Sequence, residues 1–353
     1  MRCATACSTT TNLPTVKRTV TTAVVGGLIL LVVMVVSMTM GVSSVSLAEI
    51  RGWATHSTGL FVDPAYPRPS TLRESILVDL RLPRVLMAAL VGAILAVCGV
   101  VMQAITRNDL AEPYLLGISA GASTGAVVAL IFSSWQWGIT GGAAVGALLA
   151  FAVLMGLIGG RAEDATRLVL TGVLVGFLFD ALTQLITTAF GDAEATRSAL
   201  FWLLGVLGAA RWDSLIVVAL AGAVGLLVLW ALARYLDAMA LGGDIAYTMG
   251  VPVKTVSYVV LVAVSLLTAA TVSAVGAIGF IGLIVPHAVR IIAGPKHVSL
   301  IPLSALVGAI FLVTADAFAR VVFAPQEIPV GVITALIGVP LFFMVLRRKE
   351  RQR

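Results

Sequence analysis

The chain has 353 residues, of which 59% are hydrophobic and 11% are charged, and its formal net charge is +6. Ordinary soluble domains contain about 25% charged residues, so this composition excludes an ordinary soluble domain. The apolar residues form blocks long enough to cross the ~30 Å hydrocarbon core of a bilayer as helices. The positive charge then belongs to basic residues at the membrane edges and does not indicate a nucleic-acid partner.

The N-terminal part of the chain divides into three stretches. Residues 1–19 are rich in threonine and lack apolar periodicity, which predicts a disordered cytoplasmic tail. The apolar run 20–42 is predicted to be the first span. A cleaved signal peptide is the alternative, but the run is long and no clear small-x-small site follows it. Residues 43–80 are polar and contain prolines, which predicts a segment outside the membrane.

Five further spans are predicted at residues 85–105, 115–132, 139–159, 168–190 and 215–235. The second and third of these five carry glycines at four-residue spacing, at positions 117, 121 and 125 and at positions 138, 142 and 146. This spacing places small residues on one helix face and predicts close helix packing in lipid.

Asp180 and Gln184 lie one turn apart on one face of the span at 168–190. A carboxylate at membrane depth costs ~2.5–3.5 kcal/mol on insertion scales, so it should face a cavity or a partner. We therefore take both residues as candidates for the wall of a translocation pathway, with burial against a neighbouring helix as the alternative.

Residues 237–254 form a polar island before the next apolar run. Its apolar residues recur at near-helical spacing and predict a short amphipathic helix. Gly242 and Gly243 would turn the chain before this helix, and Gly250 followed by Pro252 would end it. A short helix between two spans fits a surface on which another protein pushes, and an ordinary connecting loop is the alternative.

Spans predicted at 255–275, 276–292, 300–323 and 332–346 bring the total to about ten, and a basic tail follows at 347–353. The sequence therefore predicts an all-α polytopic membrane protein with a single transmembrane domain at 20–346. Basic residues are more frequent on the side of the two termini and of the 237–254 island. The positive-inside rule accordingly predicts that all three are cytoplasmic.

Cysteines and histidines are scattered along the chain, at Cys3, Cys7, Cys98, His56, His287 and His297. None has the spacing of a metal site or a disulfide framework, so no metal and no cofactor is expected. No lysine follows a glycine, and the chain therefore lacks a phosphate-binding loop. If ATP drives this protein, the ATPase must be another chain.

Seven motifs between residues 81 and 346 together resemble the permease subunits of type II ABC importers, which take up iron–siderophore chelates, haem and vitamin B12. They are RLPR (81–84), QAITRNDLAEPYLLGISAGAS (103–123), FWLLG (201–205), ALGGDIAYTMGV (240–251), GAIGFIGLIVPHAVR (276–290), ADAFAR (315–320) and EIPVGVITALIGVP (327–340). The resemblance implies a permease like that of the vitamin B12 importer, working as a dimer of two copies or of two paralogues in the cytoplasmic membrane of a bacterium. The implied partners are two cytoplasmic ATPase subunits, an extracytoplasmic substrate-binding lipoprotein and membrane lipid.

The resemblance also implies roles for particular residues. The island would be the coupling helix that sits in a groove of the ATPase, through Leu241, Gly242, Gly243, Ile245, Met249 and Gly250. Gly243 departs from the family pattern, as does Tyr247, because relatives often carry charged residues at these positions. Residues of a cytoplasmic gate would be Asn108, Leu110 and Thr166. To the pathway candidates Asp180 and Gln184 we add Thr334.

Arginines on the predicted outer side have a further implied role. In the vitamin B12 importer, arginines at the positions of Arg81, Arg84 and Arg320 meet glutamates of the binding protein. Anchoring to lipid headgroups is the alternative, and Asp316 lies one turn before Arg320 and could pair with it.

Two other classes of protein compete with the importer subunit. An ion-coupled secondary transporter usually needs charged relays at the membrane midplane and broken helices, for which Asp180 alone is slight support. A membrane-embedded enzyme would need clustered His, Asp or Glu residues, which the sequence lacks. The sequence favours an iron(III)–siderophore complex as cargo, with haem or cobalamin as alternatives.

Overall fold

A computed structural model describes residues 13–41, 45–58, 66, 68–132 and 138–350, and within these ranges the chain is helical and contains no strand. Seven of the helices are long and apolar enough to cross a membrane. Three shorter apolar helices accompany them, at Ile118–Phe132, Ile281–Ala293 and Val330–Phe343. Together these helices correspond to the ten predicted spans, and the all-α membrane fold is confirmed.

The elements follow one another along the chain in this order: α1 Leu13–Thr39, α2 Leu47–Thr58, α3 Thr71–Ser75, the π-helical turn η1 Ile76–Arg81, α4 Leu82–Thr106, the 3-10 turn η2 Pro113–Leu116, α5 Ile118–Phe132, α6 Gly138–Ile158, α7 Ala165–Phe190, α8 Ala193–Leu203, α9 Trp212–Ala231, α10 Ala233–Leu241, α11 Gly243–Thr248, α12 Val253–Val275, α13 Ile281–Ala293, α14 His297–Val321 and α15 Val330–Glu350.

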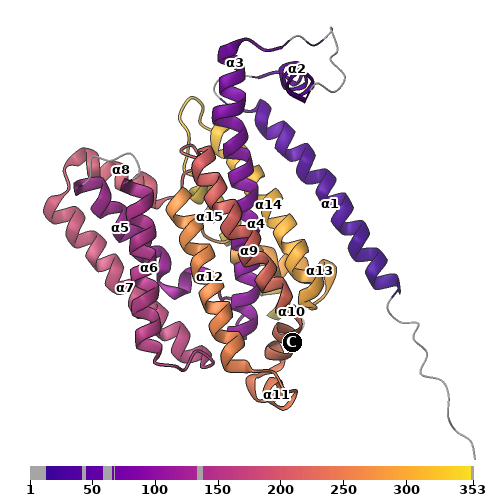
Figure 1. Cartoon of the computed structure of the whole chain (residues 1–353), viewed down its shortest axis with the longest axis vertical. Helices are drawn as coiled ribbons and strands as arrows, with labels where there is room; N and C mark the ends of the chain where they lie inside the picture. The colour runs from indigo at the N-terminus through magenta and orange to yellow at the C-terminus, as the bar shows by residue number, and fades with distance from the viewer. Residues whose placement is uncertain (1–12, 42–44, 59–65, 67, 133–137, 351–353) are drawn as a thin grey trace, which may run out of the picture.

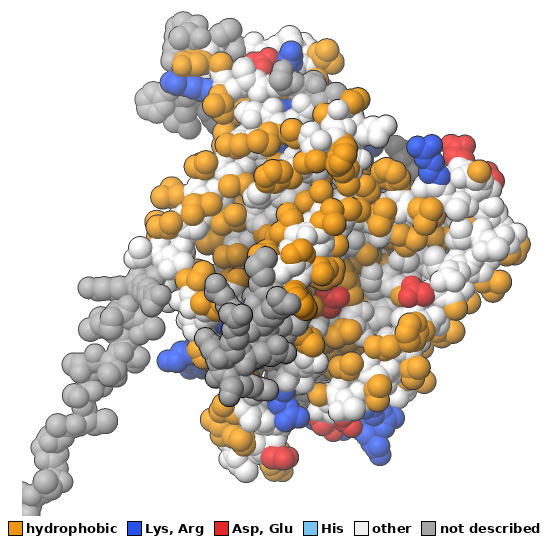
Figure 2. Space-filling model, turned by 180° about the vertical axis from the view of Figure 1, so that it is seen from behind, with side chains coloured by type: hydrophobic (Ala, Val, Ile, Leu, Met, Phe, Trp, Pro, Cys, Tyr) orange, Lys and Arg blue, Asp and Glu red, His pale blue; other side chains and the backbone are white. Residues whose placement is uncertain are grey.

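Helix α4 is the central element, and α9, α12, α13 and α14 surround it (Figure 1). Helices α5 to α8 form a lobe on one side, whereas α1 lies at the opposite edge against α14 (Figure 1). The surface shows the pattern of a membrane protein, since apolar side chains cover its middle and basic side chains gather toward its ends (Figure 2). The most buried span is α4, which explains why its sequence is apolar on every face.

The glycines at four-residue spacing bring α5 and α6 into backbone contact, as predicted. A Cβ atom on Gly125 would lie 2.0 Å from the carbonyl oxygen of Gly142, and one on Gly146 would lie 2.1 Å from that of Gly121. The same kind of contact joins α4 to α14, where a Cβ on Gly92 would lie 2.2 Å from the carbonyl oxygen of Gly308. Lipid provides no hydrophobic drive between helices, so these close approaches hold the helices together.

Replacing Gly125 with valine is therefore expected to destabilise the protein by about 1–3 kcal/mol or to prevent folding, because the new side chain overlaps the α6 backbone. Gly141 is the matched control, since a Cβ there meets no atom within 4 Å. Thermal unfolding in detergent and the yield of monodisperse protein measure the effect. Equal losses for Gly125→Val and Gly141→Val would contradict the packing argument.

Several boundaries differ from the prediction. Helix α1 begins at Leu13, so part of the predicted 1–19 tail is helical, while residues 1–12 lie outside the described part of the chain. Helix α15 continues to Glu350 into the predicted basic tail at 347–353, because Lys, Arg and Glu are good helix formers. The eighth span begins at Ile281 and not at 276, since Gly276 and Phe280 adopt positive φ angles and break the helix.

Candidate functional site

The polar island at 237–254, which we call the coupling segment, folds as two short helices. Helices α10 and α11 meet at Gly242, whose φ of +132° is open to glycine and strained for other residues. Helix α11 runs over Gly243–Thr248, and Gly250 follows it with a φ of +80°. The structure confirms the predicted glycine turns on both sides of a short helix.

Large apolar side chains project from this segment. Leu241, Ile245 and Met249 are 65%, 49% and 62% exposed, whereas Met239 is buried against the permease. Tyr247 is also exposed. Apolar side chains that gather at a polar end of the molecule mark an interaction surface, because water does not stabilise them there.

A turn after α4 carries two of the predicted gate residues. The backbone N–H of Leu110 donates to Asn108 Oδ1 at 2.9 Å, which shapes the turn, and Leu110 is half-exposed. Arg290 near the end of α13 binds Asp109 in this turn at 3.0 Å. Thr166 is exposed in the first turn of α7, in a different loop.

The Asp109–Arg290 pair was missed at the sequence level. The two residues are 181 positions apart, so no local pattern links them.

At the opposite end of the molecule, two of the three predicted arginines, Arg84 and Arg320, bind one acid, Asp316 of α14. Arg81 lines the same pocket as these two arginines. Arg84 donates from Nε and Nη2 to Asp316 Oδ1 at 3.0 and 2.9 Å and from Nη1 to Glu327 at 2.8 Å. Arg320 lies with its Nε 3.1 Å from Asp316 Oδ2. Asp316 and Arg320 are buried. The pairing of Arg320 with Asp316, left open by the sequence, is thus present, and Arg84 joins it.

Arg81 and Arg320 also fix the end of α1. Arg81 donates to the carbonyl of Met38, and Arg320 donates to the carbonyl of Met40 at 3.0 Å and to the hydroxyl of Ser37. The last carbonyls of a helix lack partners within the helix, so arginine donors satisfy them. These arginines therefore hold α1 against α4 and α14, and they do not extend toward lipid headgroups.

A small pocket of about 270 Å³ connects the arginine cluster with the molecular surface. Arg81, Arg84 and Arg320 line it together with Glu327, Ile76 and Leu80. A carboxylate that entered this pocket would meet three guanidinium groups.

The pathway candidates divide into two groups. Asp180 and Gln184 are exposed on α7, as a position in a pathway wall requires, and among the described residues neither has a hydrogen-bond or ion-pair partner. Thr334 differs from the prediction, because its side chain is fully buried and its hydroxyl donates to the carbonyl of Gly331 at 3.0 Å. It lines no open surface in this conformation.

Comparison with known proteins now decides the family. Residues 28–348 match the model of the FecCD transport family. The chain belongs to this family. It is 39% identical to the cobalamin import permease of Halobacterium salinarum over 280 residues, which are 78% of this chain and 74% of that protein. It is 36% identical to the iron(3+)-hydroxamate import permease of Bacillus subtilis over 293 residues, 80% of this chain and 74% of that protein.

A solved structure shares the whole architecture. It is described as an inward-facing metal-chelate type ABC transporter, and it matches with a TM-score of 0.81 and 29% identity, covering 92% of this chain and 98% of that one. This FecCD-family chain is accordingly a permease of a type II ABC importer, and ATP hydrolysis belongs to separate subunits. The ion-coupled transporter and the membrane enzyme are set aside.

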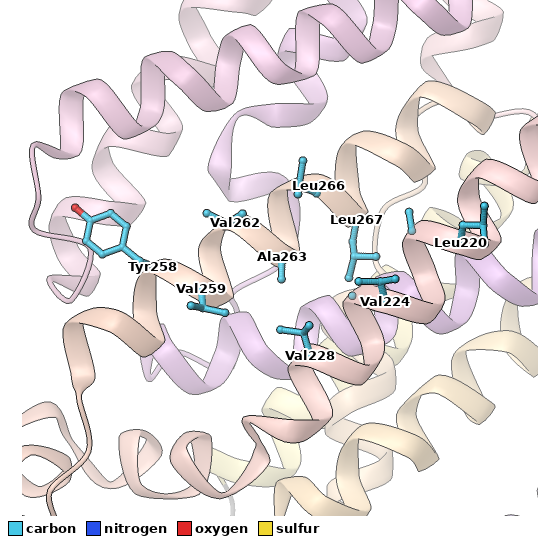
Figure 3. A pocket seen from close by; sticks show the side chains of 11 residues that line it. Leu220, Val224, Val228, Tyr258, Val259, Val262, Ala263, Leu266 and Leu267 are labelled. Atoms are coloured by element: carbon cyan, nitrogen blue, oxygen red, sulfur yellow. The ribbon is translucent and has the colours of Figure 1, made fainter.

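A groove of this FecCD permease lies between α9 and α12 and has a volume of about 640 Å³ (Figure 3). Its lining is aliphatic apart from Tyr258 at one end, with Leu220, Val224, Val262 and Leu266 along its length (Figure 3). A polar chelate would lose its hydration there without gaining hydrogen bonds. The groove is therefore unsuitable as a pathway for such a cargo.

Proposed function

We propose that this permease imports an iron(III)–siderophore complex across the cytoplasmic membrane of a bacterium. It works as one half of a dimer with a second copy or a paralogue. Two cytoplasmic ATPase subunits drive it through the coupling segment, and an extracytoplasmic lipoprotein delivers the cargo to the outer arginine cluster. The observation that carries the mechanism is the exposed apolar face of the coupling segment, formed by Leu241, Ile245 and Met249.

The orientation follows from the same segment and from charge. In this proposal the start of α1, the end of α15 and the coupling segment are cytoplasmic, because the positive-inside rule assigns the side with more basic residues to the cytoplasm. The gate turn with Asn108 and Leu110 belongs to this side as well, as does Thr166. A cytoplasmic gate at these residues would close the pathway beside the ATPase.

A dimer would provide a suitable environment for the polar side chains that are exposed on α7 in the single chain. Asp180 and Gln184 are exposed on a helix face that also carries Phe177 and Leu185. A lone carboxylate facing lipid is unfavourable, so this face requires a water-filled pathway or a second subunit. If two permeases enclose the pathway along α7, this face meets both a water-filled pathway and a second subunit.

Docking of the binding protein uses the outer pocket in this proposal. The guanidinium groups of Arg81, Arg84 and Arg320 line the pocket, and an acidic side chain of the binding protein would enter it. Arg81 and Arg320 then have two roles, since they also hold the end of α1. Charge complementarity of this kind mainly accelerates the encounter of two proteins.

Replacing Arg81 with glutamine is expected to slow association of the binding protein about tenfold at low salt and to weaken its salt dependence. Association rates measured at two ionic strengths test this, with thermal unfolding of the same samples to follow the support of α1. Arg73→Gln is the matched control, because Arg73 is a more exposed arginine outside the pocket. If both variants associate like the parent, the role of Arg81 is confined to α1.

Fewer observations support the proposed cargo than support the proposed mechanism. The relatives carry names that refer to cobalamin, iron(3+)-hydroxamate and hemin, so the family leaves the cargo open. Haem binding often uses paired axial ligands. His56 and His287 lie on different helices, α2 and α13, and are far apart in the sequence, so they do not have the arrangement of such a pair. An iron–siderophore complex needs no protein ligand to iron, and it fits a pathway with polar groups such as Asp180 and Gln184. Cobalamin is the second candidate, because the relative from Halobacterium salinarum is named as a cobalamin import permease.

Growth of a deletion strain under iron limitation, with single iron sources supplied, tests the cargo. We expect growth on at least one ferric siderophore to be lost and growth on haem to be retained. Loss of haem-dependent growth with every siderophore still used would replace the siderophore by haem, and an isolated defect in cobalamin-dependent growth would replace it by cobalamin.

A further inference from the structure

One contact ties the coupling segment directly to a membrane-spanning helix. Asp237 of α10 accepts two hydrogen bonds on Oδ1, from the backbone N–H of His297 at 2.9 Å and from the ring Nδ1 of His297 at 2.7 Å. His297 is the first residue of α14 and is buried. A single carboxylate thus joins α10 to the start of α14.

This contact replaces the usual cap of α14. The residue before the helix, Lys296, makes no side-chain capping bond. The first N–H groups of a helix lack internal partners, and negative charge is favourable near a helix N-terminus. Asp237 supplies both the acceptor and the charge from another helix, so the start of α14 depends on the position of α10.

The ring of His297 is oriented by the same bond. With an ionised Asp237, Nδ1 carries the proton and donates it, and Nε2 is left as a buried acceptor. Nε2 has no hydrogen-bond partner among the described residues. No group of three His, Cys, Asp or Glu side chains that could hold a metal occurs in the described ranges. The ring therefore acts as a structural donor to Asp237.

Helix α14 reaches from this contact to the outer arginine cluster. Its 25 residues span ~37 Å at 1.5 Å per residue, and its far end carries Asp316 and Arg320. Between the ends, Gly308 of α14 lies in close backbone contact with Gly92 of α4. At the outer end, Arg84 of α4 is bound to Asp316. The two helices form one unit that passes through the whole permease.

We propose that Asp237 and His297 are positioning residues of a tether that transmits movement of the coupling segment through α14 to the binding-protein side. The tether rests on the proposed function of the coupling segment as the ATPase contact. When ATP binding displaces α10 and α11, the carboxylate moves the start of α14 with them. Because α14 is packed closely on α4 along its length, the displacement reaches Asp316 and Arg320 and alters the outer pocket.

The test compares Asp237→Ala with Asp237→Asn in the complete transporter, reconstituted with its ATPase and its binding protein. Alanine removes both hydrogen bonds, whereas the asparagine carbonyl can accept both. We expect alanine to lower the number of substrate molecules transported per ATP hydrolysed about tenfold, within the usual range of coupling between sites. Asparagine should restore most of this ratio. His297→Ala, which keeps the backbone bond, should fall between them.

Ser299→Ala is the matched control, because its hydroxyl donates to the carbonyl of Lys296 at the same helix end. Thermal unfolding is measured for every variant. The tether is wrong if His297→Ala and Asp237→Ala transport as many molecules per ATP as Ser299→Ala. It is also wrong if transport falls only in proportion to the amount of folded transporter.

The tether and the proposed coupling segment fail in different ways. If Leu241→Asp leaves the ATPase bound, the proposed role of the coupling segment is wrong. If that variant releases the ATPase while Asp237→Ala keeps its transport per ATP, the segment stands and the tether alone is wrong.

Discussion

Replacing Leu241 with aspartate is expected to release the ATPase subunits and abolish transport while the permease stays folded. Leu241 is largely exposed in the single chain, so the permease core loses nothing when its side chain becomes polar. In the assembled transporter the same position would lie in an apolar groove of the ATPase. A carboxylate without a partner in such a groove costs several kcal/mol or more, which corresponds to at least about a hundredfold loss of affinity.

Co-purification of the ATPase with the permease and uptake into proteoliposomes measure this effect. Leu72 provides the control, because it is a similarly exposed leucine on α3 at the opposite end of the molecule. Leu72→Asp should retain the ATPase. Normal association and transport in the Leu241→Asp variant would show that the segment is a plain connecting loop.

The second large effect is expected at Asp316. Replacing it with alanine leaves Arg84 without its buried partner and removes the carboxylate partner of Arg320, both at low exposure. Removing one member of a buried ion pair typically costs about 3–5 kcal/mol, because the remaining charge loses its compensation in a region poor in water. We expect a large drop in the thermal unfolding temperature and in the yield of folded protein.

Glu327 is the matched control for this prediction. It binds the same Arg84 at 2.8 Å, but its side chain is 40% exposed, and exposed pairs are worth only about 0–1 kcal/mol. Glu327→Ala should therefore unfold close to the parent protein. An equal effect of the two substitutions would mean that burial does not distinguish the two pairs.

The sequence alone determined the features that depend on neighbouring residues. The length and hydropathy of each apolar run determined the spans, because a helix must satisfy its own backbone in lipid. Four-residue glycine spacing predicted close helix packing, since it depends only on which residues share a helix face, but it did not say which helices meet. Gly242 and Gly250 predicted the turns around α11 through their own backbone freedom.

Only the tertiary structure decided which polar groups meet. Arg84 and Asp316 are 232 positions apart, and Asp237 and His297 are 60 apart, so no helical period relates them. The sequence placed Arg81 and Arg320 on an outer surface, yet they are buried because the end of α1 packs over them and accepts their hydrogen bonds. The sequence placed Thr334 in the pathway, yet its side chain is buried in the structure. A helix carries polar residues on buried faces as well as on exposed ones. Which face of a span is buried depends on the arrangement of all the helices, and a single span does not encode it.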